Sequence, residues 1–276
     1  MLRINPVNFN LKNNTLFQRK KSDYKPDFSV LSRKNTPDIS KSALAKSKLL
    51  NIKGNLLLDK ADNVIKSANH IQKVAAGQYI CAYDVISDAK RNNFAKETDG
   101  TVVKNFIKSE NGLCTMYESN KGRVTKCVVF NPETLMIYSI SLGLDYSDKY
   151  ASRQKIFKFK AGKLSNYIEN TTQIGNILKI GAQYDFDDNK LAEYSKGIIK
   201  SGNNVKTKLG FYFENQKLSE CKLGSSMDNT GLYIKEFYTF KNRKLVEYSK
   251  NSMPYSADLG EYYALNKDGF LVKYDE

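Results

Sequence analysis

The chain lacks several residues on which common active sites depend. Its 276 residues include no tryptophan, five prolines and a single histidine, His70. One histidine excludes metal sites built from several imidazoles and most nucleophile–base pairs. The sequence contains neither G-x-x-x-x-G-K-S/T nor G-x-G-x-x-G, which excludes the common phosphate-binding loops. We therefore expect no cofactor, no metal and a protein that is not an enzyme, with His70 as a solvated or packed helix residue.

Cysteine is also sparse, and the four cysteines form no C-x-x-C pair. This spacing indicates no zinc or redox motif, so we expect reduced thiols that pack as small apolar groups. Cys114 and Cys127 flank an expected hairpin with its tip near Asn120–Gly122, and they could face each other across it. A thiol–imidazole couple of Cys81 and His70 is the alternative that would make the protein an enzyme, but nothing in their spacing requires contact.

No long apolar run is present. No segment approaches the roughly 18 apolar residues of a membrane-spanning helix. The first 22 residues are basic and free of acids, without the apolar stretch of a signal peptide. We therefore expect a cytoplasmic protein without an integral membrane segment, while unconventional secretion stays open.

Positive charge is abundant but unevenly distributed. The net charge is +15, and residues 1–60 carry +9 of it, with 13 Lys and Arg against four acids. Residues 127–276 carry only +3. Residues 1–40 are rich in proline, asparagine and lysine, so we expect a disordered basic tail. Residues 1–60 could bind an anionic membrane or nucleic acid by Coulomb attraction, or could simply be a solvated lysine-rich segment.

Residues 41–77 are predicted to be helical. Ser42 is placed to cap a short helix over 42–53 that ends before Gly54. The apolar residues of 57–76 recur at spacings of three and four, and Gly77 follows as a C-cap. From Gln78 onward the run QYICAYDVI reads as a strand. We therefore expect one antiparallel β repeat domain over residues 78–276.

The dominant feature of the sequence is a repeat of 27 residues. The blocks FKFKAGKLSNY, YDFDDNKLAEY, FYFENQKLSEC and YTFKNRKLVEY begin at Phe157, Tyr184, Phe211 and Tyr238. Looser copies at both ends extend the clear repeats over residues 128–276. Several positions that match over four consecutive units are a strong sign of a repeat architecture.

Each unit has the pattern of a half-buried hairpin. In one unit, apolar residues at alternate positions are predicted to share one face of a strand: Leu178, Ile180, Ala182, Tyr184 and Phe186. The turn pairs favour positive φ or type I turns: Ala161–Gly162, Asp188–Asn189, Asn215–Gln216 and Asn242–Arg243. The expected fold is mainly β, an antiparallel meander that forms an open sheet or half-barrel, with the N-terminal helix packed on its apolar face.

Two sets of residues are candidates for binding. A lysine precedes each repeated leucine, and this series could track a polyanion or simply keep the hairpin tips soluble: Lys163, Lys190, Lys217 and Lys244. Tyr212 and Phe237 lie on the expected polar face, where they could form an aromatic binding strip or be covered by the N-terminal helices. The segment Asp185–Lys196 looks like a calcium loop, but lysines replace its turn glycine and its bidentate glutamate, so we expect no calcium.

The blocks FYFENQKLSE and YALNKDGFLVKY resemble the aromatic–turn–leucine hairpins of MORN-variant repeat proteins, including the YwqK-like antitoxin-type family. The resemblance covers residues 128–276, although the paired glycines of those families are largely absent and the period is longer here. It implies protein interaction, lipid contact or toxin neutralisation. The opening INPVNFN is similar to N-terminal stretches of bacterial proteins, which implies a bacterial origin. Our first functional hypothesis is a noncatalytic interaction or scaffold protein that binds a partner on its sheet surface.

Overall fold

The computed structural model describes residues 40–147, 150–253 and 260–274. In this part of the chain one helix, α1 (Lys41–Arg91), precedes fifteen strands. The strands are β1 (Glu97–Asp99), β2 (Val102–Lys108), β3 (Cys114–Asn120), β4 (Arg123–Phe130), β5 (Ile137–Tyr146), β6 (Ala151–Lys160), β7 (Lys163–Ile174), β8 (Ile177–Asp187), β9 (Lys190–Ser201), β10 (Asn204–Glu214), β11 (Lys217–Met227), β12 (Leu232–Lys241), β13 (Lys244–Ser252), β14 (Glu261–Leu265) and β15 (Leu271–Tyr274). The predicted disordered tail, residues 1–40, falls outside the described residues except for Ser40.

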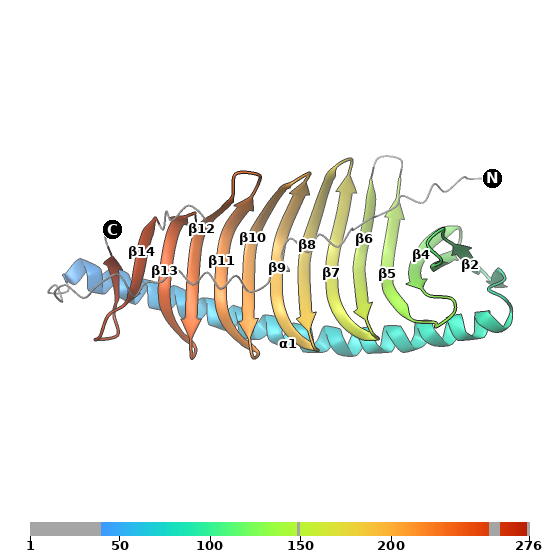
Figure 1. The fold of residues 1–276 in the computed structure, drawn as a ribbon, viewed down its shortest axis with the longest axis horizontal. Coiled ribbons are helices and arrows are strands. Elements are labelled where there is room, and N and C mark those ends of the chain that lie inside the picture. Colours follow the sequence, from blue (N-terminus) through green and yellow to red (C-terminus); the bar gives the residue numbers. More distant parts are fainter. Residues whose placement is uncertain (1–39, 148–149, 254–259, 275–276) are drawn as a thin grey trace. The chain divides into compact units, whose positions relative to one another are not determined.

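The strands form one open antiparallel sheet in which every strand pairs with its neighbours in sequence (Figure 1). The four clear repeats are the hairpins β6–β7, β8–β9, β10–β11 and β12–β13. Their turns carry two consecutive residues with positive φ, for example Asp188 at 44° and Asn189 at 60°. Two such residues define the type I′ turn, whose twist matches that of the paired strands. The predicted fold class and the predicted hairpins are therefore confirmed.

The helix is longer than the sequence predicted. It begins after Ser40, whose Oγ accepts a hydrogen bond from the Ala43 amide at 3.2 Å, so Ser42 is not the cap. It continues without interruption through Gly54 and Gly77. The predicted helix end at residue 77 is therefore wrong, and α1 covers the range 41–91.

The predicted strand QYICAYDVI is also wrong, because these residues belong to α1. Ala82, Ile86 and Ala89 are fully buried and continue the apolar stripe of the earlier turns. Packing of this stripe against the sheet outweighs the strand preference of the aromatic and β-branched residues around it. The β domain consequently begins at Glu97 rather than at Gln78.

A column of small buried residues recurs every seven positions along the whole of α1. Its members are Ser47, Gly54, Ala61, Ala68, Ala75, Ala82 and Ala89. Seven helical residues rise by about 10.5 Å. Two neighbouring strands span roughly 9.6 Å. One heptad of the helix therefore matches one hairpin of the sheet.

Two contacts show how closely this column approaches the strands. The Leu271 amide donates a hydrogen bond to the Ser47 Oγ at 3.0 Å. A Cβ on Gly54 would lie 3.1 Å from the Cβ of Leu245. Gly54 is thus a point of close approach between helix and sheet, and not the helix end that the sequence predicted.

α1 crosses the strands with its N-terminus at the last hairpins and its C-terminus near β2 (Figure 1). Contacts along its length follow this reversed order. In sequence along α1 they are Lys53 with Glu236, Asp62 with Arg243, Gln72 with the Asn189 carbonyl, Tyr79 with Phe159, and Lys90 with the Glu133 carbonyl. The predicted packing of the N-terminal helix on the sheet is confirmed.

Aromatic side chains fill the layer between helix and sheet. Consecutive ring centroids along β6–β10 are 4.9, 5.8, 4.8 and 6.1 Å apart, in the order Phe157, Tyr167, Tyr184, Tyr194 and Phe211. All five rings are buried, in one cluster with the small residues of α1. The repeat therefore builds a continuous core instead of separate hairpin cores.

A second, smaller cluster lies on the opposite face of the sheet. It contains Ile156, Ile168, Ile180, Ile198 and Val205. Neighbouring residues of a strand point to opposite faces. Tyr167 belongs to the cluster under α1, so Ile168 points away from the helix.

The prediction that the alternate apolar residues of β8 all share one face is wrong. Ile180 belongs to it, whereas Ala182 and Tyr184 lie in the cluster under α1. The alternation reverses beside Asn170, a residue with a φ of 53° in the paired strand β7. Residues with positive φ recur at this place in every unit: Gly143, Asn170, Gly197, Gly224 and Asn251. In each long hairpin, the apolar residues between the tight turn and this positive-φ residue therefore face α1. The apolar residues on the far side of the positive-φ residue face the opposite way.

Candidate functional site: the open face of the sheet

The two faces of the sheet are covered differently. α1 packs on one face; within the described ranges no other element covers the second, which we call the open face. One row of cross-strand partners runs across it from β6 to β13. Its members are Lys158, Asn166, Asp185, Glu193, Tyr212, Glu220, Thr239 and Glu247. Each has a chain neighbour in the cluster under α1, an aromatic residue in every case except Glu220, whose neighbour is Cys221, and this fixes the row on the open face.

Two carboxylates lie directly opposite each other in this row. Asp185 of β8 pairs with Glu193 of β9. The Gln183 Nε2 donates to the Asp185 Oδ2 at 2.8 Å, and the Ser195 Oγ donates to the Glu193 Oε1 at 2.9 Å. The Asn166 Nδ2 also donates to Asp185. The pair is therefore held in place by neutral donors of the same face.

The electrostatics of the pair are unusual for a sheet surface. Burial raises the pKa of Glu193 to about 7, and the negative charge of Asp185 contributes to the shift. Burial also raises the pKa of Asp185. Burial lowers the pKa values of Lys158 and Lys200 in the same region. A positively charged group from outside would favour the ionised form of both carboxylates.

Tyr212 and Phe237, which the sequence proposed as an aromatic strip, both lie on the open face. The Lys222 Nζ lies between them, 4.3 Å from the Tyr212 ring centroid and 5.8 Å from that of Phe237. A Cβ on Gly210 would lie 3.5 Å from the Tyr212 ring, so this ring lies over the glycine. α1 covers neither aromatic, which makes the alternative of a helical cover wrong.

The turn lysines Lys163, Lys190, Lys217 and Lys244 are exposed, each at the first residue of a strand. The Lys163 Nζ forms an ion pair with Asp188 of the next turn at 2.8 Å. Because one hairpin separates consecutive members, they are roughly 10 Å apart. The structure places them along the tight turns, and it does not bring them together with Tyr212 or Phe237.

Sequence reasoning missed the carboxylate pair and the lysine between the aromatics. The sequence does contain a signal for the glutamates of the row. The motif Leu-x-Glu recurs in three consecutive units, and its glutamates are Glu193, Glu220 and Glu247. All three fall in the open-face row. Lys222 has no counterpart of this kind in the repeat, and only the strand register places it beside Phe237.

The cysteines do not form a pair. Cys114 lies opposite Phe130, and Cys127 lies opposite Tyr117, so the prediction that the two thiols face each other is wrong. Cys114, Cys127 and Cys221 are buried free thiols, whereas Cys81 is exposed on α1. Burial raises the pKa of Cys127 to about 11. His70 and Cys81 are eleven residues apart on one helix, a rise of about 16 Å, which excludes a thiol–imidazole couple.

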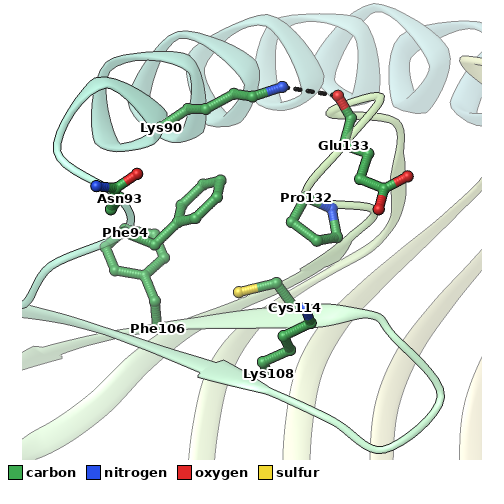
Figure 2. Close-up of a pocket in the computed structure, with 8 residues that line it drawn as sticks. All are labelled: Lys90, Asn93, Phe94, Phe106, Lys108, Cys114, Pro132 and Glu133. Atoms are coloured by element: carbon green, nitrogen blue, oxygen red, sulfur yellow. Dashed lines mark hydrogen bonds between the residues drawn. The ribbon is translucent and has the colours of Figure 1, made fainter.

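A cavity of about 510 Å³ lies where α1 ends. Figure 2 shows its lining, with the Phe94 and Phe106 rings on one side and the Cys114 thiol between β3 and the helix end. The ring centroids of Phe94 and Phe106 are 5.6 Å apart. The Lys90 Nζ donates to the Glu133 carbonyl at 2.7 Å. Burial raises the pKa of Cys114, so this thiol stays protonated near neutral pH.

The described residues contain no group of three His, Cys, Asp or Glu side chains arranged to hold a metal ion. α1 has no stretch apolar enough to cross a membrane.

No family model and no curated protein matches the sequence. Two solved structures show a partial likeness: S. aureus TarM, and a TarM mutant in complex with fondaparinux, alpha-GlcNAc-glycerol and UDP. Each is 12% identical, with a TM-score of 0.17, and the likeness covers 62% of this chain and 27% of the TarM chain. The similar region is thus about a quarter of TarM, and at this TM-score it carries no argument about fold or activity.

Proposed function

We propose that the protein is a noncatalytic repeat scaffold that binds a partner protein on the open face of its sheet. The observation that carries this proposal is the row at the centre of that face. The row contains the carboxylate pair, Asp185 and Glu193, and also Tyr212, beside which Lys222 and Phe237 lie on the same face. Aromatic and charged groups held by their neighbours lose little side-chain entropy when a partner binds.

The chemistry of the row favours a partner that presents a cationic side chain beside apolar ones. An arginine or lysine of the partner would neutralise Asp185 and Glu193, which share no cation of their own at hydrogen-bond distance in the described residues. Burial of this new pair strengthens its charge-assisted hydrogen bonds. Tyr212 and Phe237 supply flat amphipathic or apolar surface of the kind that dominates protein interfaces.

The noncatalytic part of the proposal is supported by where the reactive groups lie. Asp185 and Glu193 lie on the surface of a sheet, while the cavity of about 510 Å³ lies at the end of α1 and contains neither of them. Catalytic carboxylates usually line a concave pocket that excludes water from the substrate. Asp185 and Glu193 do not line the second cavity either, which has a volume of about 550 Å³ and lies beside His70 and Glu169.

The test begins with a photo-crosslinking residue at Thr239 in the open-face row, and with a control residue at Asn63 on the exposed side of α1. A protein captured from Thr239 is then purified, and its affinity is measured by titration. We expect Glu193→Gln and Phe237→Ala each to weaken binding about tenfold. Lys190→Gln, on a tight turn, is expected to bind as the wild type does. Unchanged affinity in both open-face variants, or capture from Asn63 alone, would overturn the proposal.

A further inference from the structure

The outward side of α1 carries an apolar stripe that no described residue covers. The exposed fractions of Leu49, Ile52 and Leu56 are 62, 58 and 55%. Together with the exposed Ala45 they follow a spacing of four, three and four residues, which places all four on one side of a helix. This side is directly opposite the buried column of Ser47, Gly54 and Ala61, because a helix turns by about 100° per residue.

Lysines border the stripe on both sides. Lys46, Lys53 and Lys60 follow one edge, and Lys41 and Lys48 follow the other. All five are exposed, and Asp59 is the single acid between residues 41 and 60. One of the lysines, Lys53, also forms an ion pair with Glu236 of the sheet, with an N–O distance of 3.1 Å. The arrangement is an apolar centre between two positive margins on a helix that is already folded.

We propose that this stripe docks the protein onto an anionic lipid bilayer. A basic amphipathic helix of this form lies in the plane of a membrane, with its apolar side chains among the acyl chains and its lysines at the head groups. Long lysine side chains reach the head-group level while their carbon stems cover apolar surface. The membrane is contacted by the side of α1 that faces away from the sheet, so the open face stays accessible to another partner.

Charge decides between this occupant and a second copy of the chain. Two such stripes packed together would bring ten lysines against two aspartates, as five lysines and Asp59 border each stripe. Repulsion between the lysines of the two copies disfavours this association, whereas an anionic surface attracts the lysines. Nucleic acid would satisfy the lysines but would leave Leu49, Ile52 and Leu56 in water.

The C-terminal half of the same helix provides a natural control. Ile80 is as exposed as the residues of the stripe, at 60%. Its exposed neighbours on the outward side include Asp84 and Asp88. These two carboxylates weaken the attraction between the surface around Ile80 and an anionic bilayer, so the proposed site is confined to about the first four turns of α1.

The experiment is co-sedimentation of the full chain with phosphatidylcholine vesicles, with and without phosphatidylglycerol. We expect binding only to the vesicles that contain phosphatidylglycerol, and weaker binding as salt is added. Ile52→Ser and a combined Lys48→Gln/Lys60→Gln variant are each expected to lose about tenfold in affinity. Ile80→Ser is the matched control and is expected to bind as the wild type does. Circular dichroism checks that each variant keeps its helix.

Several outcomes would overturn the proposal. These are no sedimentation of the wild type with anionic vesicles, equal binding to both vesicle types, or equal loss in Ile80→Ser and Ile52→Ser. Two others name a different occupant. A dimer in analytical ultracentrifugation that Ile52→Ser dissociates would assign the stripe to self-association. Binding to a duplex oligonucleotide that Ile52→Ser leaves intact would assign the lysines to nucleic acid.

Discussion

The two faces of the sheet hold their side chains in place by different means. Under α1, aromatic rings and leucines pack against a column of small helix residues, and the cluster contains Phe211 and Tyr238 at 0% exposure. On the open face, carboxylates, amides and a lysine hold one another by hydrogen bonds and by contacts with aromatic rings. The covered face holds the larger apolar cluster and therefore supplies more of the stability, although the open face adds its own smaller cluster around Ile168.

The largest expected effect compares one phenylalanine from each face. Phe211→Ala leaves a cavity under α1 and is expected to lower the free energy of unfolding by about 3–5 kcal/mol. Phe237→Ala removes a ring that is only partly buried on the open face, and is expected to cost about 1 kcal/mol. Urea-induced unfolding measures both. Equal losses would mean that the two faces contribute equally to stability.

A smaller effect is expected from pH, and it belongs to the open face alone. The pKa of Glu193 is raised to about 7 from an ordinary value of 4.5, so between these values the folded chain keeps a proton that the unfolded chain has released. Stability from this group is therefore greatest below about pH 4.5 and is lost as pH rises through 7, by on the order of 2 kcal/mol.

The variant Glu193→Gln isolates this contribution. Its free energy of unfolding is expected to fall less than that of the wild type between pH 5 and pH 8, as measured by urea titration at each pH. Parallel pH profiles for the two proteins would show that Glu193 has an ordinary pKa and that the carboxylate pair is well solvated.

The smallest effect concerns two glycines of α1, one on each side of the helix. Gly77 is exposed with no atom within 4 Å of an added Cβ, so Gly77→Ala is expected to stabilise the protein by about 0.5–1 kcal/mol through helix propensity. In Gly54→Ala the new Cβ would lie 3.1 Å from the Leu245 Cβ, which offsets this gain. The Tm values of the two variants, measured by thermal unfolding, test this difference. An equal rise in Tm would mean that the helix can move away from β13 at no cost.

The hairpins could be predicted from the sequence because their determinants are local. Turn pairs such as Asp188–Asn189 and the repeated leucines lie within a few residues of each other, and their spacing of 27 residues is visible without any tertiary contact. The end of α1 could not be predicted in this way. Tyr79, Ile80 and Val85 favour strands, and only the packing of Ala82, Ile86 and Ala89 on the sheet keeps the segment helical.

The open face was predicted only in part. Tyr212 and Phe237 follow from alternation within a strand, but the carboxylate pair depends on how two strands are aligned. A bulge between Asp185 and Phe186 shifts that alignment, and a simple count from the turn does not reveal it. The reversal beside Asn170 was also missed, although a glycine or asparagine recurs at this place every 27 residues, as in Gly143, Gly197 and Gly224.

The match between helix and hairpin has a consequence for how this chain can change in length. A duplicated unit adds 27 residues to the sheet, but its apolar face stays uncovered unless α1 gains seven residues at a distant position in the sequence. Either insertion alone is unfavourable. A hairpin added without a longer helix leaves its aromatic rings exposed to water. Seven residues added to α1 without a new hairpin move the small residues on one side of the insertion by one hairpin relative to the sheet. The number of hairpins in the sheet is therefore coupled to the number of heptads in α1, and the length of α1 limits how many hairpins can share one core.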